Sequence, residues 1–232
     1  MKKIAVLTAL LFAALQIGYA QKVGLVLSGG GAKGAAHIGV IKALEENGIP
    51  IDYITGTSAG AIVGSLYAMG YTPEEMVELM LSEEFSYWQT GTVENEYKYY
   101  FKRPDPTPEF GHFSIDMTDS LQVKASFLPQ SLINPIQMNQ AFMALFSQAT
   151  AKAGWNFDNL FVPFRCVASD IYSKKAIIFK NGDLGDAVRA SMTFPFFFQP
   201  IWKDSVPIFD GGIYDNFPVG PMKDAFHPDF LF

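Results

Sequence analysis

Two glycine-rich turns, each between an apolar run and a helical segment, constrain the fold of this chain most strongly. The first turn, Gly29 to Gly34, follows the apolar run Val23 to Leu27. The second, Gly56 to Gly60, follows Ile51 to Thr55. Repeated strand–turn–helix units are typical of a parallel sheet covered by helices. The sequence therefore predicts an α/β fold.

The same rhythm returns in the second half of the chain, after an irregular segment at about 82–134. We expect helices over about 34–46, 59–69, 72–81, 135–151 and 184–192, and further strands over 161–169, 175–179 and 206–209. The irregular segment contains Pro104, Pro106 and Pro108 and is interpreted as an insertion, a hairpin or loop outside the sheet. The final run, Pro228 to Phe232, is typical of the start of a strand. We therefore expect that the C-terminus is truncated.

The first twenty residues have the pattern of a secretory signal peptide. Lys2 and Lys3 precede the apolar run Ile4 to Ile17, and Gly18 and Ala20 supply the small residues of a cleavage site. An uncleaved N-terminal anchor helix is the alternative. We expect an exported protein, in the periplasm, the outer membrane or outside the cell, with residues 21–232 as its one domain.

Charge and cysteine content exclude several classes of function. The formal net charge is −6, and it becomes more negative without Lys2 and Lys3, which argues against nucleic acid as a partner. The lone cysteine, Cys166, lies in an apolar run, so no internal disulfide is expected, and a small buried side chain fits it better than a nucleophile.

The second glycine turn has the pattern of a nucleophile elbow. Its sequence is Gly-Thr-Ser-Ala-Gly, with Ser58 at the centre, after a strand and before a helix. Such a turn holds the serine in a strained conformation and points its hydroxyl away from the sheet, and the helix N-terminus favours negative charge there. The pattern also occurs in ordinary turns, but this placement favours Ser58 as a nucleophile.

The first glycine turn is suited to an oxyanion hole. Consecutive glycines leave backbone N–H groups unobstructed, and those of Gly30 and Gly31, with Gly29 and Ala59 beside them, could bind a developing oxyanion. A dinucleotide site is the alternative, since the turn also fits G-x-G-x-x-G. That alternative requires an acidic residue at the end of the next strand, whereas Asp52 precedes it.

Several residues could activate the hydroxyl of Ser58. The candidate bases are the three histidines, His37, His112 and His227, and the carboxylate Asp210. His227 has the chain order of an α/β-hydrolase triad. Asp210 is the better candidate, since it ends a short strand and precedes two glycines, a turn that would expose a carboxylate able to act as a general base. An ordinary Asp-Gly-Gly turn is the alternative.

Taken together, these segments resemble the patatin-like phospholipase family. The matching segments, in the family's order, are Gly29 to Gly34, Gly56 to Gly60, Ala190 to Pro195 and Asp210 to Gly212. The resemblance implies a three-layer α/β/α sandwich with a mostly parallel central sheet. It also implies a dyad of Ser58 and Asp210 without a histidine, metal or cofactor, and hydrolysis of lipid acyl esters through an acyl-enzyme, as in a phospholipase A or lysophospholipase.

The resemblance also bears on partners. It implies a lipid or phospholipid substrate at a membrane surface, and some exported bacterial members carry a C-terminal membrane β-barrel. The aromatic segment Ala190 to Trp202 would line the acyl chain or pack in the core, and Lys33 is expected to be a solvated loop residue. Two other functions remain open: nucleotide binding by the Gly29–Gly34 loop, and a non-catalytic secreted lipid-binding domain.

Overall fold

The computed structural model describes residues 21–93, 112–116, 122–126 and 131–232. The expected signal peptide, residues 1–20, lies outside the described residues, as does most of the expected insertion between 94 and 130. No helix in the described part of the chain combines the length and the apolar character needed to cross a bilayer.

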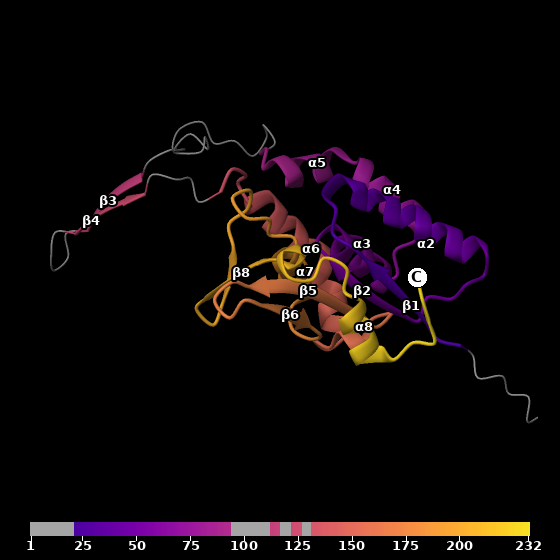
Figure 1. Ribbon diagram of the computed structural model, residues 1–232. Helices are drawn as coiled ribbons and strands as arrows, with labels where there is room; N and C mark the ends of the chain where they lie inside the picture. The colour runs from indigo at the N-terminus through magenta and orange to yellow at the C-terminus, as the bar shows by residue number, and fades with distance from the viewer. Residues whose placement is uncertain (1–20, 94–111, 117–121, 127–130) are drawn as a thin grey trace, which may run out of the picture.

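A seven-stranded mixed sheet forms the centre of the molecule, in the order β7-β8-β5-β2-β1-β9, with β6 paired to β5 (Figure 1). The strands are β1 Val23–Leu27, β2 Tyr53–Thr57, β5 Phe164–Asp170, β6 Lys175–Phe179, β7 Ile201–Lys203, β8 Val206–Asp210 and β9 Phe230–Leu231. The pairs β9–β1, β1–β2 and β2–β5 are parallel, whereas β6 and β8 run antiparallel to β5, and β7 antiparallel to β8. Only β6 and β8 thus oppose the other strands, and the strands are mostly parallel.

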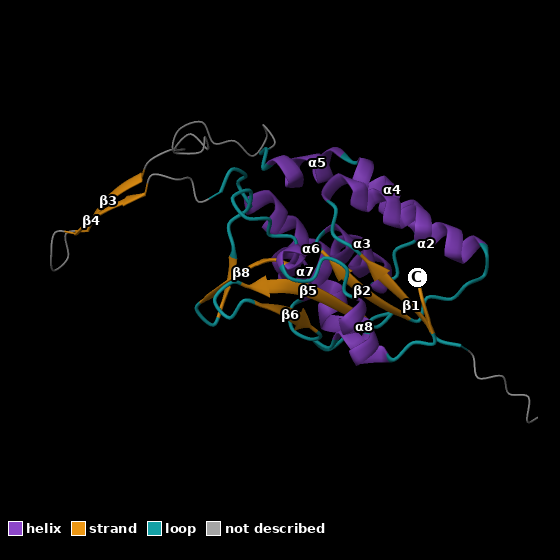
Figure 2. Ribbon diagram, viewed as in Figure 1, coloured by secondary structure: helices purple, strands orange, loops and turns teal. Residues whose placement is uncertain are grey.

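Helices cover both faces of this sheet (Figures 1 and 2). They are α2 Ala36–Glu46, α3 Ala59–Ala68, α4 Pro73–Leu81, α5 Glu83–Thr90, α6 Ile136–Lys152, α7 Leu184–Ser191 and α8 Val219–Phe226, with short 3-10 turns η1 Gly31–Ala35, η3 Phe157–Asn159 and η4 Gly211–Ile213. The helix α8 packs against β1 and β2 on one face, whereas α3 and α7 pack on the other. The expected α/β/α layering is confirmed, with unequal layers.

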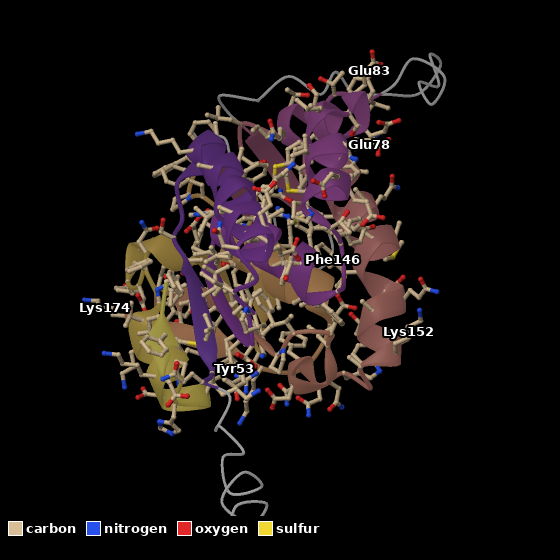
Figure 3. The ribbon with its side chains drawn as sticks, turned by 90° about the vertical axis from the view of Figure 1, so that its right-hand side faces the viewer. Tyr53, Glu78, Glu83, Phe146, Lys152 and Lys174 are labelled. Carbon is tan, nitrogen blue, oxygen red and sulfur yellow. The ribbon has the colours of Figure 1, made fainter. Side chains whose placement is uncertain are left out.

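The alternation of side chains along β2 explains this inequality. Ile54 faces α3, where its side chain would touch any Cβ added at Gly64, and belongs to the main hydrophobic core. Its neighbour Thr55 faces the other side and donates a hydrogen bond to the carbonyl of Pro218, just before α8. Figure 3 shows Phe146 of α6 in the interior on the thicker side. Most of the buried apolar surface therefore lies on the α3 side.

Most expected elements are present, and the exceptions have physical causes. β1 and β6 have the expected bounds, whereas β2 begins and ends two residues later than expected, so it runs directly into the serine turn. The short elements β7 and α8 were not predicted, since three residues are too few for a periodic signal and Gly220 and Pro221 interrupt the helical pattern. The run Phe230–Leu231 does pair as a strand, with β1.

The irregular segment at about 82–134 contains an unpredicted helix and a hairpin. Its first part is α5, capped by the side chain of Ser82, which accepts from the amide of Phe85. Further on, β3 His112–Asp116 and β4 Gln122–Ser126 form an antiparallel pair separate from the central sheet.

Candidate active site

Ser58 lies at the sharp turn between β2 and α3, with φ of 54° and ψ of −120°. A positive φ is rare for a residue with a side chain and marks backbone strain. The turn is tight enough that added Cβ atoms would collide with backbone: one on Gly56 would meet the carbonyl of Gly60, and one on Gly60 the carbonyl of Leu27. The two glycines of the pattern are thus required by close packing, and the turn has the geometry of a nucleophile elbow.

The pairing of β5 explains how Asp210 reaches this turn. Val167 of β5 pairs with β2 on one edge and β6 on the other, and Ala168 pairs with β6 and β8. Because a strand has only two edges, β2 and β8 follow one another along the same edge of β5. They approach head to head, since Thr57 at the end of β2 lies opposite Val167 and Asp210 at the end of β8 lies opposite Ala168.

The side chains at these two strand ends meet directly. The hydroxyl of Ser58 donates a hydrogen bond to Oδ2 of Asp210 at 2.6 Å, across 152 residues of sequence. The other carboxylate oxygen accepts from the amide of Gly212 at 2.7 Å. Asp210 is only 6% exposed, and burial raises the pKa of its carboxyl, although the two hydrogen bonds oppose that shift. A carboxylate with a raised pKa is a stronger base, suited to accept a proton from a hydroxyl.

The C-terminal turn of α7 holds both of these residues by their backbones. Ser191 is fully buried, accepts the amide of Ser58 at 2.9 Å and donates to the carbonyl of Val167 at 2.6 Å. The carbonyl of Thr193 accepts the amide of Asp210 at 2.8 Å. No local pattern in the sequence indicates these roles of Ser191 and Thr193; the available signal is two small polar residues just before an aromatic run.

The glycine loop packs against the serine turn from the other side. A Cβ on Gly29 would lie 3.1 Å from that of Ser58, and one on Gly34 would collide with Ala59. The amide of Gly29 is occupied, because it donates to the carbonyl of Asn216 at 3.1 Å. Within the described residues, the amides of Gly30, Gly31 and Ala59 donate no hydrogen bond. Of the expected oxyanion donors, these three are available and Gly29 is not.

Neither of the two histidines whose side chains are described, His37 and His227, forms a hydrogen bond with Ser58. A ring nitrogen of His37 lies 2.9 Å from the carbonyl of Ser28, and His227 ends α8, whose Phe226 stacks on Tyr53 at the far end of β2. The third histidine, His112, lies in β3, whose backbone alone is described.

Asp52 and Cys166 also have structural roles. The carboxylate of Asp52 accepts from the Lys22 side chain and the Val23 amide, at the opposite end of the sheet from the glycine loop. That position removes the acidic partner that a dinucleotide site would need. Cys166 is fully buried, and burial raises the pKa of its thiol, so it is not a nucleophile.

The aromatic segment after α7 is split between core and surface. Phe198 is buried, whereas Phe194, Phe196 and Phe197 are exposed, as is Trp202. Core packing therefore accounts for Phe198 alone among these residues. Lys33 is exposed, as expected.

Comparisons with known proteins agree with this geometry. A patatin-like phospholipase domain profile matches residues 25–223. The chain is 29% identical to the patatin-like phospholipase domain-containing protein ZK370.4 of Caenorhabditis elegans, over 87% of the chain and 13% of that protein. It is 31% identical to the lysophospholipase NTE1 of Pyricularia oryzae, over 88% of the chain and 11% of that protein. The chain thus spans only a small part of these relatives.

A solved structure shares the fold. The crystal structure of VipD from Legionella pneumophila is similar with a TM-score of 0.50 and 16% sequence identity, over 85% of this chain and 47% of that one. The profile match covers most of the chain, including both strand ends that meet in the site. The chain therefore belongs to the patatin-like phospholipase family, a family of lipid hydrolases.

Proposed function

We propose that this protein is a serine esterase that hydrolyses acyl esters of lipids, in the manner of a phospholipase A or lysophospholipase. The observation that carries the proposal is the 2.6 Å hydrogen bond from the strained Ser58 to the buried carboxylate of Asp210. A serine hydroxyl bonded to a base and placed at a helix N-terminus is the arrangement that nucleophilic catalysis requires.

The first half-reaction forms an acyl-enzyme. Asp210 takes the hydroxyl proton as Oγ of Ser58 bonds to the ester carbonyl carbon, and the carbonyl oxygen becomes an oxyanion. The free amides of Gly30, Gly31 and Ala59 donate to that oxyanion, with the partial positive charge of the N-terminus of α3. When the tetrahedral intermediate collapses, the ester C–O bond breaks and the leaving alkoxide takes the proton from Asp210.

The second half-reaction repeats these roles, with water as the nucleophile and Ser58 as the leaving group. Asp210 takes a proton from water, and the resulting hydroxide oxygen bonds to the acyl carbon. Collapse breaks the bond to Oγ of Ser58, which regains its proton, and a fatty acid is released. Asp210 thus acts as base and then acid in each half, and its burial supports this because it brings the pKa of the carboxyl closer to neutrality.

The proposal extends to the setting of the reaction. The substrate is a lipid or phospholipid at a membrane surface, and the protein is exported through its N-terminal segment. Neither nucleotide binding nor a silent lipid-binding role has a specific observation in its favour, since Asp52 lies far from the glycine loop and Ser58 is already paired with a base.

The test is labelling by a fluorophosphonate, which reacts only with an activated serine. Wild type should be labelled, and Ser58→Ala should not. Asp210→Asn should lose at least about a hundredfold in labelling rate, because the variant keeps the shape of the side chain but lacks a base.

His227→Ala serves as the matched control, since it removes a candidate base at the far end of the sheet. Its labelling should equal that of wild type. A folded His227→Ala protein without labelling would replace the dyad by a triad, and an unlabelled wild type would end the esterase proposal.

A further inference from the structure

A group of exposed apolar side chains lies on the loops whose backbone contacts Ser58, Asp210 or the glycine loop. We call it the apolar rim, and it consists of Phe194, Phe196, Phe197, Ile213, Tyr214 and Phe217. Several of its members come directly after, in the sequence, residues that form hydrogen bonds within the site. Phe194 follows Thr193, which accepts the amide of Asp210, and Ile213 follows Gly212, which donates to the Asp210 carboxylate. Phe217 follows Asn216, whose carbonyl accepts a hydrogen bond from the amide of Gly29. The rim is thus part of the loops that form the site.

The rim has the apolar, uncharged composition of a surface that transfers readily from water into an apolar phase. The segment 192–202 contains no charged residue, and 211–217 contains one, Asp215. Phe194 is 56% exposed, Phe196 71% and Phe217 53%. Monomeric proteins rarely expose contiguous groups of large apolar side chains unless these contact a partner or a membrane.

Two backbone carbonyls of the rim are already hydrogen-bonded. The carbonyls of Phe196 and Phe197 accept the amides of Leu132 and Ile133, each at 2.9 Å. These carbonyls therefore need no water when the rim enters an apolar phase.

A buried arginine fixes the same loop from behind. The guanidinium of Arg189, only 3% exposed, donates to Oγ1 of Thr193 and to the carbonyl of Gln199, and it lies over the ring of Phe198. The loop that carries the exposed rings is thus held in place before any partner binds, which lowers the entropy cost of binding.

Backbone strain at Phe196 also indicates that the exposure of its side chain has a function. Its φ is 69°, a conformation that a phenylalanine adopts at a cost, and yet its ring is the most exposed of the rim. Core packing does not explain that strain, because the side chain is not in the core. The loop instead holds an aromatic ring out towards solvent.

We propose that the apolar rim docks this protein on a lipid bilayer, inserting its aromatic rings among the acyl chains so that the ester groups reach Ser58. The proposal rests on the function proposed above. A bilayer is favoured over a protein partner because the loops of the rim also hold Asp210 and the glycine loop, so a protein bound there would compete with substrate, whereas a bilayer supplies it. Aromatic side chains without charge are also the type that enters the membrane interface.

The test compares two double variants, both in a Ser58→Ala background so that no lipid is hydrolysed. The rim variant is Phe196→Asn with Phe217→Asn. The control is Trp155→Asn with Phe161→Asn, which removes two aromatics of similar exposure, 58% and 75%, near the opposite end of β5. Phe196 and Trp155 both have positive φ, 69° and 63°, a conformation that asparagine tolerates, so both variants should fold.

The measurement is co-sedimentation with phosphatidylcholine vesicles, at low and high salt. The rim variant should lose at least about tenfold in partition coefficient, the effect of withdrawing one phenylalanine from an apolar phase. The control should bind like its parent, and high salt should not release the protein, because the rim has almost no charge.

Three results would overturn the docking proposal. They are a parent that does not bind vesicles, equal binding or equal loss in both double variants, and a parent dimer that the rim variant dissociates. If the rim variant unfolds, Phe217→Asn alone carries the comparison. Since these proteins lack Ser58, vesicle binding is independent of the fluorophosphonate test, and either proposal can fail while the other stands.

Discussion

At the residue scale, the proposed catalytic pair, Ser58 and Asp210, depends on polar groups that do not react. The amide of Ser58 and the carbonyl of Val167 are both bound by one buried hydroxyl, that of Ser191. Loss of that hydroxyl would remove a hydrogen-bond partner from both backbone groups, and leaving a buried group of this kind unsatisfied costs about 1–3 kcal/mol. Ser191 is therefore a positioning residue, since it fixes the turn that carries the nucleophile.

We predict that Ser191→Ala slows fluorophosphonate labelling by about tenfold to a hundredfold, because a small displacement of a nucleophile from its base is costly. The effect should appear in the maximal labelling rate and not in the probe concentration at half-maximal rate.

Ser65→Ala is the matched control, since Ser65 is equally buried but donates only to Ile62 within α3. Both variants should lose stability, measured by denaturant unfolding, and only Ser191→Ala should lose labelling. Equal labelling in the two variants would remove the positioning role.

At the element scale, the elbow depends on how closely β1 and α3 approach. Gly60 lies in the first turn of α3, and a Cβ there would collide with the carbonyl of Leu27 at the end of β1. Helix propensity alone favours alanine over glycine by about 1 kcal/mol. Tertiary packing therefore overrides propensity at this position.

Two identical substitutions separate these effects. Gly39 lies within α2, and an added Cβ there would meet nothing within 4 Å. We predict that Gly39→Ala raises the free energy of unfolding by about 0.5–1 kcal/mol, whereas Gly60→Ala lowers it by about 1–3 kcal/mol through overpacking.

Urea unfolding of both variants measures the two free energies, and labelling reports on the elbow. Gly39→Ala should keep the wild-type labelling rate, whereas Gly60→Ala should lower it because β1 and α3 must separate. A stabilised Gly60→Ala protein would contradict the close approach.

At the scale of the whole molecule, the site imposes a cost on folding. Burial raises the pKa of the Asp210 carboxyl above its value in the unfolded chain. The folded state therefore prefers the protonated form, so the contribution of this group to stability is full below its unfolded pKa and is lost as the pH rises through its folded pKa.

We predict that Asp210→Asn, although inactive, is more stable than wild type at neutral pH, because it removes a buried charge. The advantage should shrink as the pH falls through the folded pKa of Asp210 and vanish near its unfolded pKa of about 3.9. Thermal unfolding across this pH range measures the difference.

Asp158→Asn, by contrast, should be less stable than wild type at neutral pH. The carboxylate of Asp158 lies 2.7 Å from the guanidinium of Arg165, which is only 7% exposed, so the substitution leaves a buried cation without its ion pair. If both variants were destabilised alike at neutral pH, the buried charge of Asp210 would not be a cost to the fold.

The sequence by itself determined the local features of this protein. The two glycine turns and their flanking elements follow from short-range rules: period, caps and the steric demands of turns. They predicted β1, the serine turn and α3, and they singled out Ser58 as the nucleophile. Such features depend on a few neighbouring residues, so they can be read without the rest of the chain.

Only the tertiary structure decided which of these features meet. Asp210 competed with three histidines in the sequence, and the shared edge of β5 brought it to Ser58 across 152 residues. The roles of Ser191 and Thr193, the occupied amide of Gly29 and the exposed rim also depend on contacts between distant segments. Strand pairing and packing set such contacts, and no local pattern encodes them.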